Sequence, residues 1–477
     1  MKNNKGTNLL YFLGKMNKTS FNVLLYLIFT IAVSFRIVLA TVNKGYANDD
    51  HLKVSTLILE TGKIPEPQDC WECNQQKLYH FTVAKLWTFL QLNTDKERFL
   101  LAQLINAIAG IFTIVICWLF IKKQPFRESA KLLCFSLVAL NPGLIAINAQ
   151  ASNDSFVILF GTIVIYSLYK LMNKPTIKSF LILLIFSILA GITKTNSLVL
   201  IVGVISVLVI KIISNRNYKF SLNKGYLGSL IIYLIATTLT VGYFGEYFSN
   251  YEKYGKPLVY TVPTGEMPHL YKKTSFFRPG VQSIIDGYFT FRMIDMIKHP
   301  IITNDKYSYP LHRTSVWSQL YGRANFIYFD DWPSGPWQCN DPKMLNIGRV
   351  ALTLALVPFL FFLFGLVMDF RIWSALLFRG KVDFLRTSNE WVFHIFIVGY
   401  LIFIFFFTAI GRDFSYMKVI YIFPGILAVL IPLLKGSDYV YGNILKNRML
   451  FLIFHAIIFV LLLSYLIPIV NLITRLA

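Results

Sequence analysis

The feature that most constrains this chain is a series of apolar runs, each about 20 residues long, that recurs along the whole sequence. A helix of about 20 residues crosses the roughly 30 Å of hydrocarbon in a bilayer. Only 15% of the residues are charged, whereas a soluble chain carries about 25%. The mean hydropathy is +0.56. The sequence therefore predicts an all-α polytopic membrane protein.

We predict about eleven membrane-spanning helices, with the N-terminus in the cytoplasm. The predicted spans are residues 21–40, 99–121, 131–147, 156–171, 177–192, 197–213, 226–243, 347–368, 391–410, 417–434 and 449–473. Several middle runs are short, and two of them also fit a re-entrant pair. The first run is too long for a cleavable signal, and no small-residue cleavage pattern follows it. We therefore expect it to be retained as the first span.

Two long hydrophilic segments divide the chain into groups of spans. The expected parts are a cytoplasmic N-terminus (1–20), the first span (21–40), a first extracytoplasmic loop (41–97), a membrane core (98–244), a large extracytoplasmic loop (245–346) and the last spans (347–477). The large loop is rich in Tyr, Trp, Pro and Gly, which is typical of an ordered segment.

The first loop is predicted to contain two amphipathic helices, because apolar residues recur at helical spacing in residues 50–61 and 77–92. Gly62 ends the first of them, and Pro65 and Pro67 prevent it from resuming. Two such helices on either side of a turn are expected to lie in the plane of the membrane interface.

The charge distribution predicts the orientation. The segments predicted to lie inside hold 22 Lys and Arg against 5 acidic residues, whereas the outer segments hold 23 against 19. Because cytoplasmic loops are enriched in Lys and Arg, both long loops are expected to face outward. The excess of Lys and Arg in the cytoplasmic loops then explains the net charge of +22. Because binding to nucleic acid is not needed to explain this charge, we predict no nucleic-acid partner. High Lys, Asn and Ile contents favour an AT-rich bacterial genome, so we expect the protein in a bacterial inner (plasma) membrane.

Asp49 and Asp50, followed by His51, lie at the outer end of the first span. Adjacent carboxylates repel each other, which raises the pKa of one of them and suits it to act as a base. The alternative is that these acids only cap the interfacial helix. His51 and His80 are further polar candidates, either for tuning the site or as ordinary surface residues.

Asp154, in a short outer loop with Asn153, is expected on the same face as the acidic pair. It either caps the fourth span or adds a second acid to the same pocket. Asp49 and Asp154 are possible ligands of a divalent metal, although nothing in their spacing requires one. No other cofactor is indicated.

Three basic residues are candidates for binding an anionic headgroup such as a phosphate. Lys194 lies in an outer turn, and Arg412 and Lys418 lie at the outer end of the tenth span. The alternative is that they anchor the helices at the lipid headgroups, with Arg412 paired to Asp413. Charge this close to the membrane favours a functional role.

Three cysteines are predicted outside, where disulfides are permitted: Cys70, Cys73 and Cys339. A short disulfide between Cys70 and Cys73, or a bond from one of them to Cys339, is favoured over redox catalysis. Because no second CxxC motif is present, a zinc site is not indicated. The sequence also shows no Walker, GxGxxG, HExxH or GxSxG pattern, and hence no signature of a nucleotide-driven motor or a hydrolase.

In combination these features resemble the GT-C superfamily of membrane glycosyltransferases, most closely its branch of protein O-mannosyltransferases and aminoarabinose transferases. The residues that carry the resemblance are Asp49-Asp50-His51, Glu60-Thr61-Gly62-Lys63-Ile64-Pro65, Lys77-Leu78-Tyr79-His80, Asn141-Pro142, Asn153-Asp154-Ser155, Gly191-Ile192-Thr193-Lys194 and Arg412 with Pro424. The resemblance covers about the first 200 residues and the tenth span. The Asp-Asp pair departs from the commoner Asp-Glu of that branch, which leaves the role of each acid within the pair open.

The resemblance implies a transferase that uses a polyprenyl-phosphate-linked sugar and a lipid, glycan or protein acceptor. Asp49 or Asp50 would be the base, Asp154 would shape the site, and Lys194 and Arg412 would hold the departing phosphate. Attack opposite the phosphate would invert the anomeric centre. The alternatives are a transporter or lipid flippase of cell-envelope precursors, for which internal repeats would be expected, and a structural assembly subunit.

Overall fold

A computed structural model of the chain describes residues 18–47, 50–215, 220–259, 287–301, 315–327, 337, 341–378, 385, 388–410 and 417–477. These residues form helices joined by loops, and no β-strand occurs among them. The predicted all-α class is confirmed.

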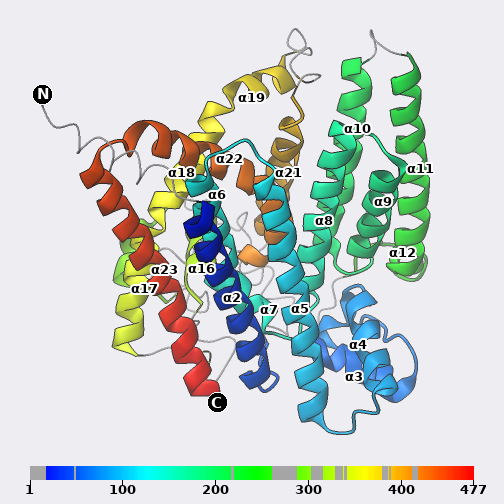
Figure 1. The fold of residues 1–477 in the computed structure, drawn as a ribbon. Helices are drawn as coiled ribbons and strands as arrows, with labels where there is room; N and C mark the ends of the chain where they lie inside the picture. The colour runs from blue at the N-terminus through cyan, green and yellow to red at the C-terminus, as the bar shows by residue number, and fades with distance from the viewer. Residues whose placement is uncertain are drawn as a thin grey trace, which may run out of the picture.

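Figure 1 shows a bundle in which most of the long helices run between the same two ends of the molecule. Its first half contains α2 (Lys18–Val42), α3 (His51–Thr61), η1 (Trp71–Asn74), α4 (Leu78–Phe89), α5 (Asp95–Lys122), α6 (Glu128–Ala139), α7 (Pro142–Asn148), α8 (Asp154–Asn173), α9 (Ile177–Gly191), η2 (Thr195–Ser197), α10 (Leu198–Asn215), α11 (Phe220–Phe244) and α12 (Tyr247–Tyr254). The second half contains α15 (Met293–Lys298), α16 (Val316–Asn325), α17 (Pro342–Leu354), α18 (Leu356–Met368), α19 (Phe370–Leu377), α21 (Trp391–Ile410), η6 (Val419–Tyr421), η7 (Phe423–Gly425), α22 (Ile426–Tyr439), the π-helical η8 (Val440–Ile444) and α23 (Arg448–Leu476).

Nine stretches of the described residues are long and apolar enough to cross a membrane, or ten if the bent pair α6–α7 is one span. The bent pair, with an angle of 45° between its helices, corresponds to the predicted third span. The predicted fifth span corresponds to α9, which has only 15 residues. The protein is thus polytopic with nine or ten candidate spans, and α9 as an eleventh stays a prediction.

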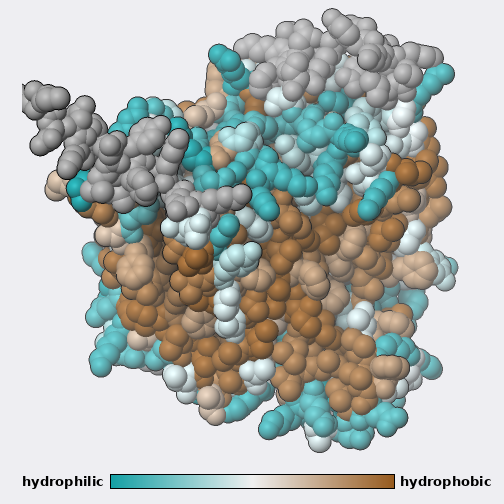
Figure 2. All heavy atoms as spheres, in the orientation of Figure 1, coloured by the Kyte–Doolittle hydropathy of each residue, from teal (hydrophilic) through white to brown (hydrophobic). Residues whose placement is uncertain are grey.

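The surface of the bundle carries a hydrophobic belt. On the face drawn in Figure 2, hydrophobic residues fill the middle of the molecule, and hydrophilic residues lie above and below them. Phe112, Ile185, Val202 and Phe406 are among the apolar side chains left exposed. An apolar band between two polar rims is the surface that a bilayer requires.

The helices of the first loop begin and end where their sequence predicts. The side chain of Asp50 caps α3 by accepting a hydrogen bond from the backbone N–H of Lys53, and Gly62 ends α3 with a φ of +66°, a conformation that glycine adopts without strain. Helices form in both predicted ranges, as α3 and α4, and both lie outside the candidate spans. Figure 1 shows them at the end of the bundle where α7 and α12 also lie.

The bend between α6 and α7 is held by a buried arginine from α2. Pro142 begins α7, and Asn141 caps it by accepting from the N–H of Leu144. The Arg36 guanidinium donates to the carbonyl of Ala139 at 2.8 Å and to Asn148 Oδ1 at 2.9 Å. The carbonyl at the end of α6, which has no partner within its helix, is thereby satisfied.

The crossing of α18 and α22 depends on two glycines. A Cβ at Gly365 would contact the carbonyl oxygen of Pro432, and a Cβ at Gly436 would contact that of Phe361. Small residues allow helix backbones to approach closely inside a membrane. This crossing forms one wall of the apolar cavity described below.

Candidate active site

The candidate site lies where the first loop meets the ends of several membrane helices. Asp154 is the first residue of α8, and Lys194 directly precedes η2. The two form a buried ion pair with 2.6 Å between Lys194 Nζ and Asp154 Oδ1, and their side chains are only 8% and 5% exposed. Two desolvated charges of this kind persist only when each compensates the other.

Two further charged or polar side chains lie near Asp154. His51 and Lys418 both interact electrostatically with its carboxylate. The ammonium of Lys194 also lies 5.8 Å from the centre of the Tyr421 ring. Lys418 is buried and lines a small pocket that also includes Gln150 and Arg323. Lys194 and Lys418 thus both lie close enough to this carboxylate to interact with it.

His51 and His80 form the wall of the site on the side of the first loop. Their rings are stacked with centroids 5.6 Å apart, and both side chains are buried. Burial lowers the pKa of His80 well below its usual value, and the nearby charges of His51, Lys77 and Lys194 lower it further. The imidazole of His80 is therefore neutral at pH 7.

Asp50 is exposed at the lip of this region, where it caps α3 with 3.3 Å between its Oδ1 and the N of Lys53. The capping role that the sequence suggested is thus present. It does not exclude a second role, because a carboxylate offers about four acceptor positions and the cap uses one.

The first loop is joined to the site by hydrogen bonds that the sequence did not predict. Asn153 Nδ2 donates to Gln75 Oε1 at 2.6 Å and to the carbonyl of Thr193 at 3.3 Å. Thr195 Oγ1 donates to Gln76 Oε1 at 3.0 Å. Asn153 occupies the N-cap position of α8, but its side chain makes no capping bond there. The only signal in the sequence is the amide-rich run Asn74-Gln75-Gln76 beside the CxxC motif.

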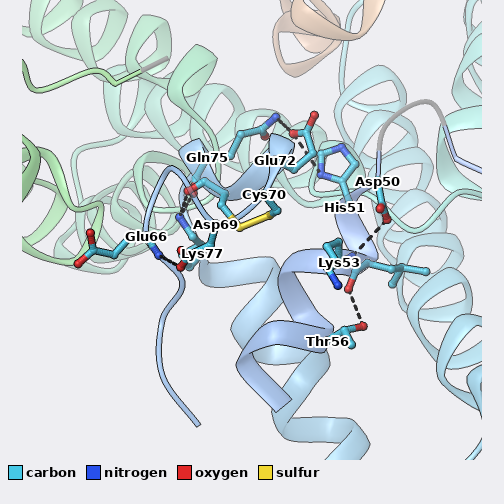
Figure 3. The surroundings of a disulfide bond; sticks show 12 residues. Asp50, His51, Lys53, Thr56, Glu66, Asp69, Cys70, Glu72, Gln75 and Lys77 are labelled. Atoms are coloured by element: carbon cyan, nitrogen blue, oxygen red, sulfur yellow. Dashed lines mark hydrogen bonds and ion pairs between the residues drawn. A yellow bond between two sulfur atoms is a disulfide. The ribbon is translucent and has the colours of Figure 1, made fainter. Parts of the chain in front are cut away.

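The structure thus brings together Asp154, Lys194, Lys418, His51 and His80, with Asp50 adjacent to His51. Asp49, Arg412 and Cys339 lie outside the described residues. Cys70 and Cys73 form a disulfide (Figure 3). Among the residues that the structure describes, no group of three or more His, Cys, Asp and Glu gathers as a metal site would.

A large apolar cavity adjoins the lysine-bearing side of the site. Its volume is about 580 Å³, and its walls come from α16, α18, α21 and α22. Val419, which follows Lys418 directly, is part of the lining, and so is Ile422. Val419 also lines the small pocket that contains Lys418, so the cavity and that pocket share this residue.

Part of the region that contains this site matches a known protein family. Residues 78–247 match the family model described as dolichyl-phosphate-mannose-protein mannosyltransferase. This range includes His80, Asp154 and Lys194, but not Asp50 or Lys418. The match confirms the resemblance to the GT-C glycosyltransferases and the prediction of a transferase.

Two solved structures resemble the fold at 10% sequence identity. One is the crystal structure of ArnT from Cupriavidus metallidurans bound to undecaprenyl phosphate, with a TM-score of 0.42, covering 95% of this chain and 75% of that chain. The other is the apo oligosaccharyltransferase of Archaeoglobus fulgidus, with a TM-score of 0.45, covering 96% and 56%. No curated protein matches the chain.

Proposed function

We propose that this chain, a membrane glycosyltransferase whose residues 78–247 match the family model described as dolichyl-phosphate-mannose-protein mannosyltransferase, transfers a sugar from a polyprenyl-phosphate donor to an acceptor on the extracytoplasmic side. The acceptor class is a lipid, a glycan or a protein hydroxyl or amine. The observation that carries the proposal is that the matched region contains the buried Lys194–Asp154 pair.

The donor phosphate is assigned to the basic side of the site. The bond to Asp154 uses one of the three N–H groups of the Lys194 ammonium, and Lys418 adds a second buried cation. Negative charge builds on the phosphate as the sugar leaves, so fixed cations stabilise the transition state more than the ground state. Arg412 joins this group by the resemblance.

The polyprenyl chain of the donor is assigned to the apolar cavity. Its lining includes Phe359, Phe396 and Tyr400, and a cavity of about 580 Å³ is large enough for several isoprene units by the usual size of ligand pockets. Because Val419 follows Lys418, a chain in the cavity would bring its phosphate to the lysines.

The catalytic base is assigned to Asp49 or Asp50. Asp50 is exposed at the lip of the site and keeps acceptor capacity beyond its capping bond. Asp154 is not assigned this role, because it is buried and paired with Lys194; it shapes the charge of the site instead. A single displacement opposite the departing phosphate would invert the anomeric centre.

The side of the membrane follows from the charge distribution. The site lies at the end of the bundle that carries α3, α4 and α12 (Figure 1), and the sequence assigns this end to the outside through the excess of Lys and Arg in the opposite loops. The donor would reach the site from the outer leaflet.

The test is transfer of labelled sugar from a polyprenyl-phosphate donor by the purified protein in liposomes. We expect Asp49→Asn or Asp50→Asn to abolish transfer, and Lys194→Ala to raise the donor KM and lower kcat. Asp95→Asn, at a carboxylate that is 78% exposed, is the matched control and should retain activity. Full sugar transfer by both Asp49→Asn and Asp50→Asn would overturn the assignment of the catalytic base. Movement of the substrate across the bilayer without sugar transfer would favour a transporter.

A further inference from the structure

The turn of residues 70–77, which we call the CxxC turn, connects the candidate site with the start of the large outer loop. It contains η1 and the disulfide between Cys70 and Cys73, whose Cα atoms are 5.0 Å apart. Cys73 is fully buried against Val54 and Ile58 of α3 and Ala84 of α4. The disulfide therefore fixes the turn between the two helices of the first loop.

On one side the CxxC turn presents two polar side chains to the site (Figure 3). Glu72 is 4% exposed, and its Oε2 lies 3.7 Å from Nδ1 of His51. Gln75 accepts the hydrogen bond from Asn153 and also donates to the Glu72 carboxylate. The turn thus contacts the residue that follows Asp50 and the residue that precedes Asp154.

On the other side the turn is fixed by a lysine. The buried ammonium of Lys77 donates to the carbonyls of Cys73 at 2.7 Å and Gln75 at 2.5 Å, and to Glu246 Oε2 at 3.1 Å. Glu246 precedes α12 and has a φ of +63°, which is uncommon for a residue with a side chain. The same turn therefore joins the site to the first residues of the large outer loop.

We propose that Glu72 and Gln75 are positioning residues for sugar transfer and that the Cys70–Cys73 disulfide holds them in place, so that the oxidised enzyme is the active one. The inference rests on the transferase function proposed above. Glu72 orients His51 beside Asp50, and Gln75 orients Asn153 at the start of α8. A displacement of about 1 Å in such groups costs up to about 100-fold in rate.

The first experiment compares reduced and oxidised protein. Dithiothreitol converts the disulfide into two thiols and is itself oxidised to its cyclic disulfide. We expect kcat of the native chain to fall about tenfold after reduction, with the donor KM changed less than about twofold. The double variant Cys70→Ser/Cys73→Ser should show the same low kcat without dithiothreitol and no further loss with it.

Two controls define the source of the effect. Cys339→Ser should keep both full activity and full sensitivity to dithiothreitol, since the effect is assigned to the Cys70–Cys73 bond. Alkylation and mass spectrometry verify that both thiols are free in the reduced sample. If protein with free Cys70 and Cys73 transfers sugar at the native rate, the inference is overturned.

The second experiment replaces Glu72 and leaves the Cys70–Cys73 disulfide oxidised. We expect Glu72→Gln to lower kcat about tenfold with an unchanged donor KM, and Glu72→Asp to recover part of the rate because the carboxylate is restored. Glu66→Gln is the matched control, because Glu66 lies in the same loop and binds Lys253 and Tyr254 outside the site. A Glu72→Gln protein with native kcat would contradict the inference, whereas a native protein that transfers no sugar would contradict the proposed function itself.

Discussion

The Lys194–Asp154 pair is the residue-scale feature with the clearest energetic consequence. Both side chains are buried, so removing one charge leaves the other desolvated without compensation. We expect Lys194→Met to destabilise the protein by about 3–5 kcal/mol, measured as thermal unfolding in detergent. An unfolding temperature equal to that of the native chain would show that the pair is not desolvated.

Replacing both charges separates stability from activity. The double variant Lys194→Met/Asp154→Leu should recover most of the lost stability, because an apolar pair of similar volume often replaces a buried ion pair at no cost. It should not recover sugar transfer, which needs the cation. Lys253→Met, at an exposed pair with Glu66, is the control and should leave the unfolding temperature almost unchanged.

His80 makes the stability of the outer end depend on pH. Its pKa in the folded protein is well below the ordinary value because of burial, whereas an unfolded histidine titrates near about 6.5. Below that pH the unfolded chain binds more protons than the folded one, so stability is lost as the pH falls. We expect the unfolding temperature to drop between pH 7.5 and pH 5, and to drop less in His80→Phe. Equal slopes for both proteins would exclude His80 as the source.

Sequence reasoning found the charged residues of the site but not their pairing. It predicted Asp154 and Lys194 on one face, with Lys194 either binding a phosphate or anchoring the helix at the lipid headgroups, whereas the structure pairs the two at 2.6 Å. Spacing along the chain cannot show such a contact, because two turns 40 residues apart meet only through the packing of α8 and α9. Gln75 was not predicted as a site residue for the same reason, since its partner Asn153 lies on another element.

At the scale of elements, the close crossing of α18 and α22 has no room for a side chain at its glycines. We expect Gly365→Ala to destabilise the protein by about 1–3 kcal/mol, because its Cβ would contact the Pro432 carbonyl. Gly225→Ala in α11, where a Cβ meets nothing within 4 Å, is the matched control and should be neutral or slightly stabilising. The measurement is thermal unfolding, and equal effects at both positions would contradict the packing argument.

Elements governed by local chemistry were predictable, and those governed by packing were not. The end of α3 followed from Gly62, and its start from the Asn48–Asp50 run, in which Asp50 supplies the cap, because capping acts within a few residues. The third predicted span instead breaks at Pro142 into α6 and α7. A proline predicts that a helix bends or ends, but the partners of Arg36 that hold this bend come from distant parts of the sequence.

At the scale of the whole molecule, the orientation can be tested by cysteine labelling in intact cells. Lys85 on α4 and Lys174 after α8 are both exposed and lie on opposite predicted sides. A membrane-impermeant maleimide should label Lys85→Cys in intact cells, and Lys174→Cys only after permeabilisation. We expect this labelling because the excess of Lys and Arg places the loop of Lys174 in the cytoplasm. The reverse labelling pattern would show that the topology is opposite to the predicted one.

The buried arginine of α2 also bears on how the chain enters the membrane. A guanidinium inside an inserting helix is costly, and the partners of Arg36 at Ala139 and Asn148 are synthesised about 100 residues later. The first helix is therefore expected to remain beside the insertion machinery until α6 and α7 have emerged. Its release into lipid would then be coupled to the arrival of the bent pair, which makes the order of synthesis part of the folding mechanism.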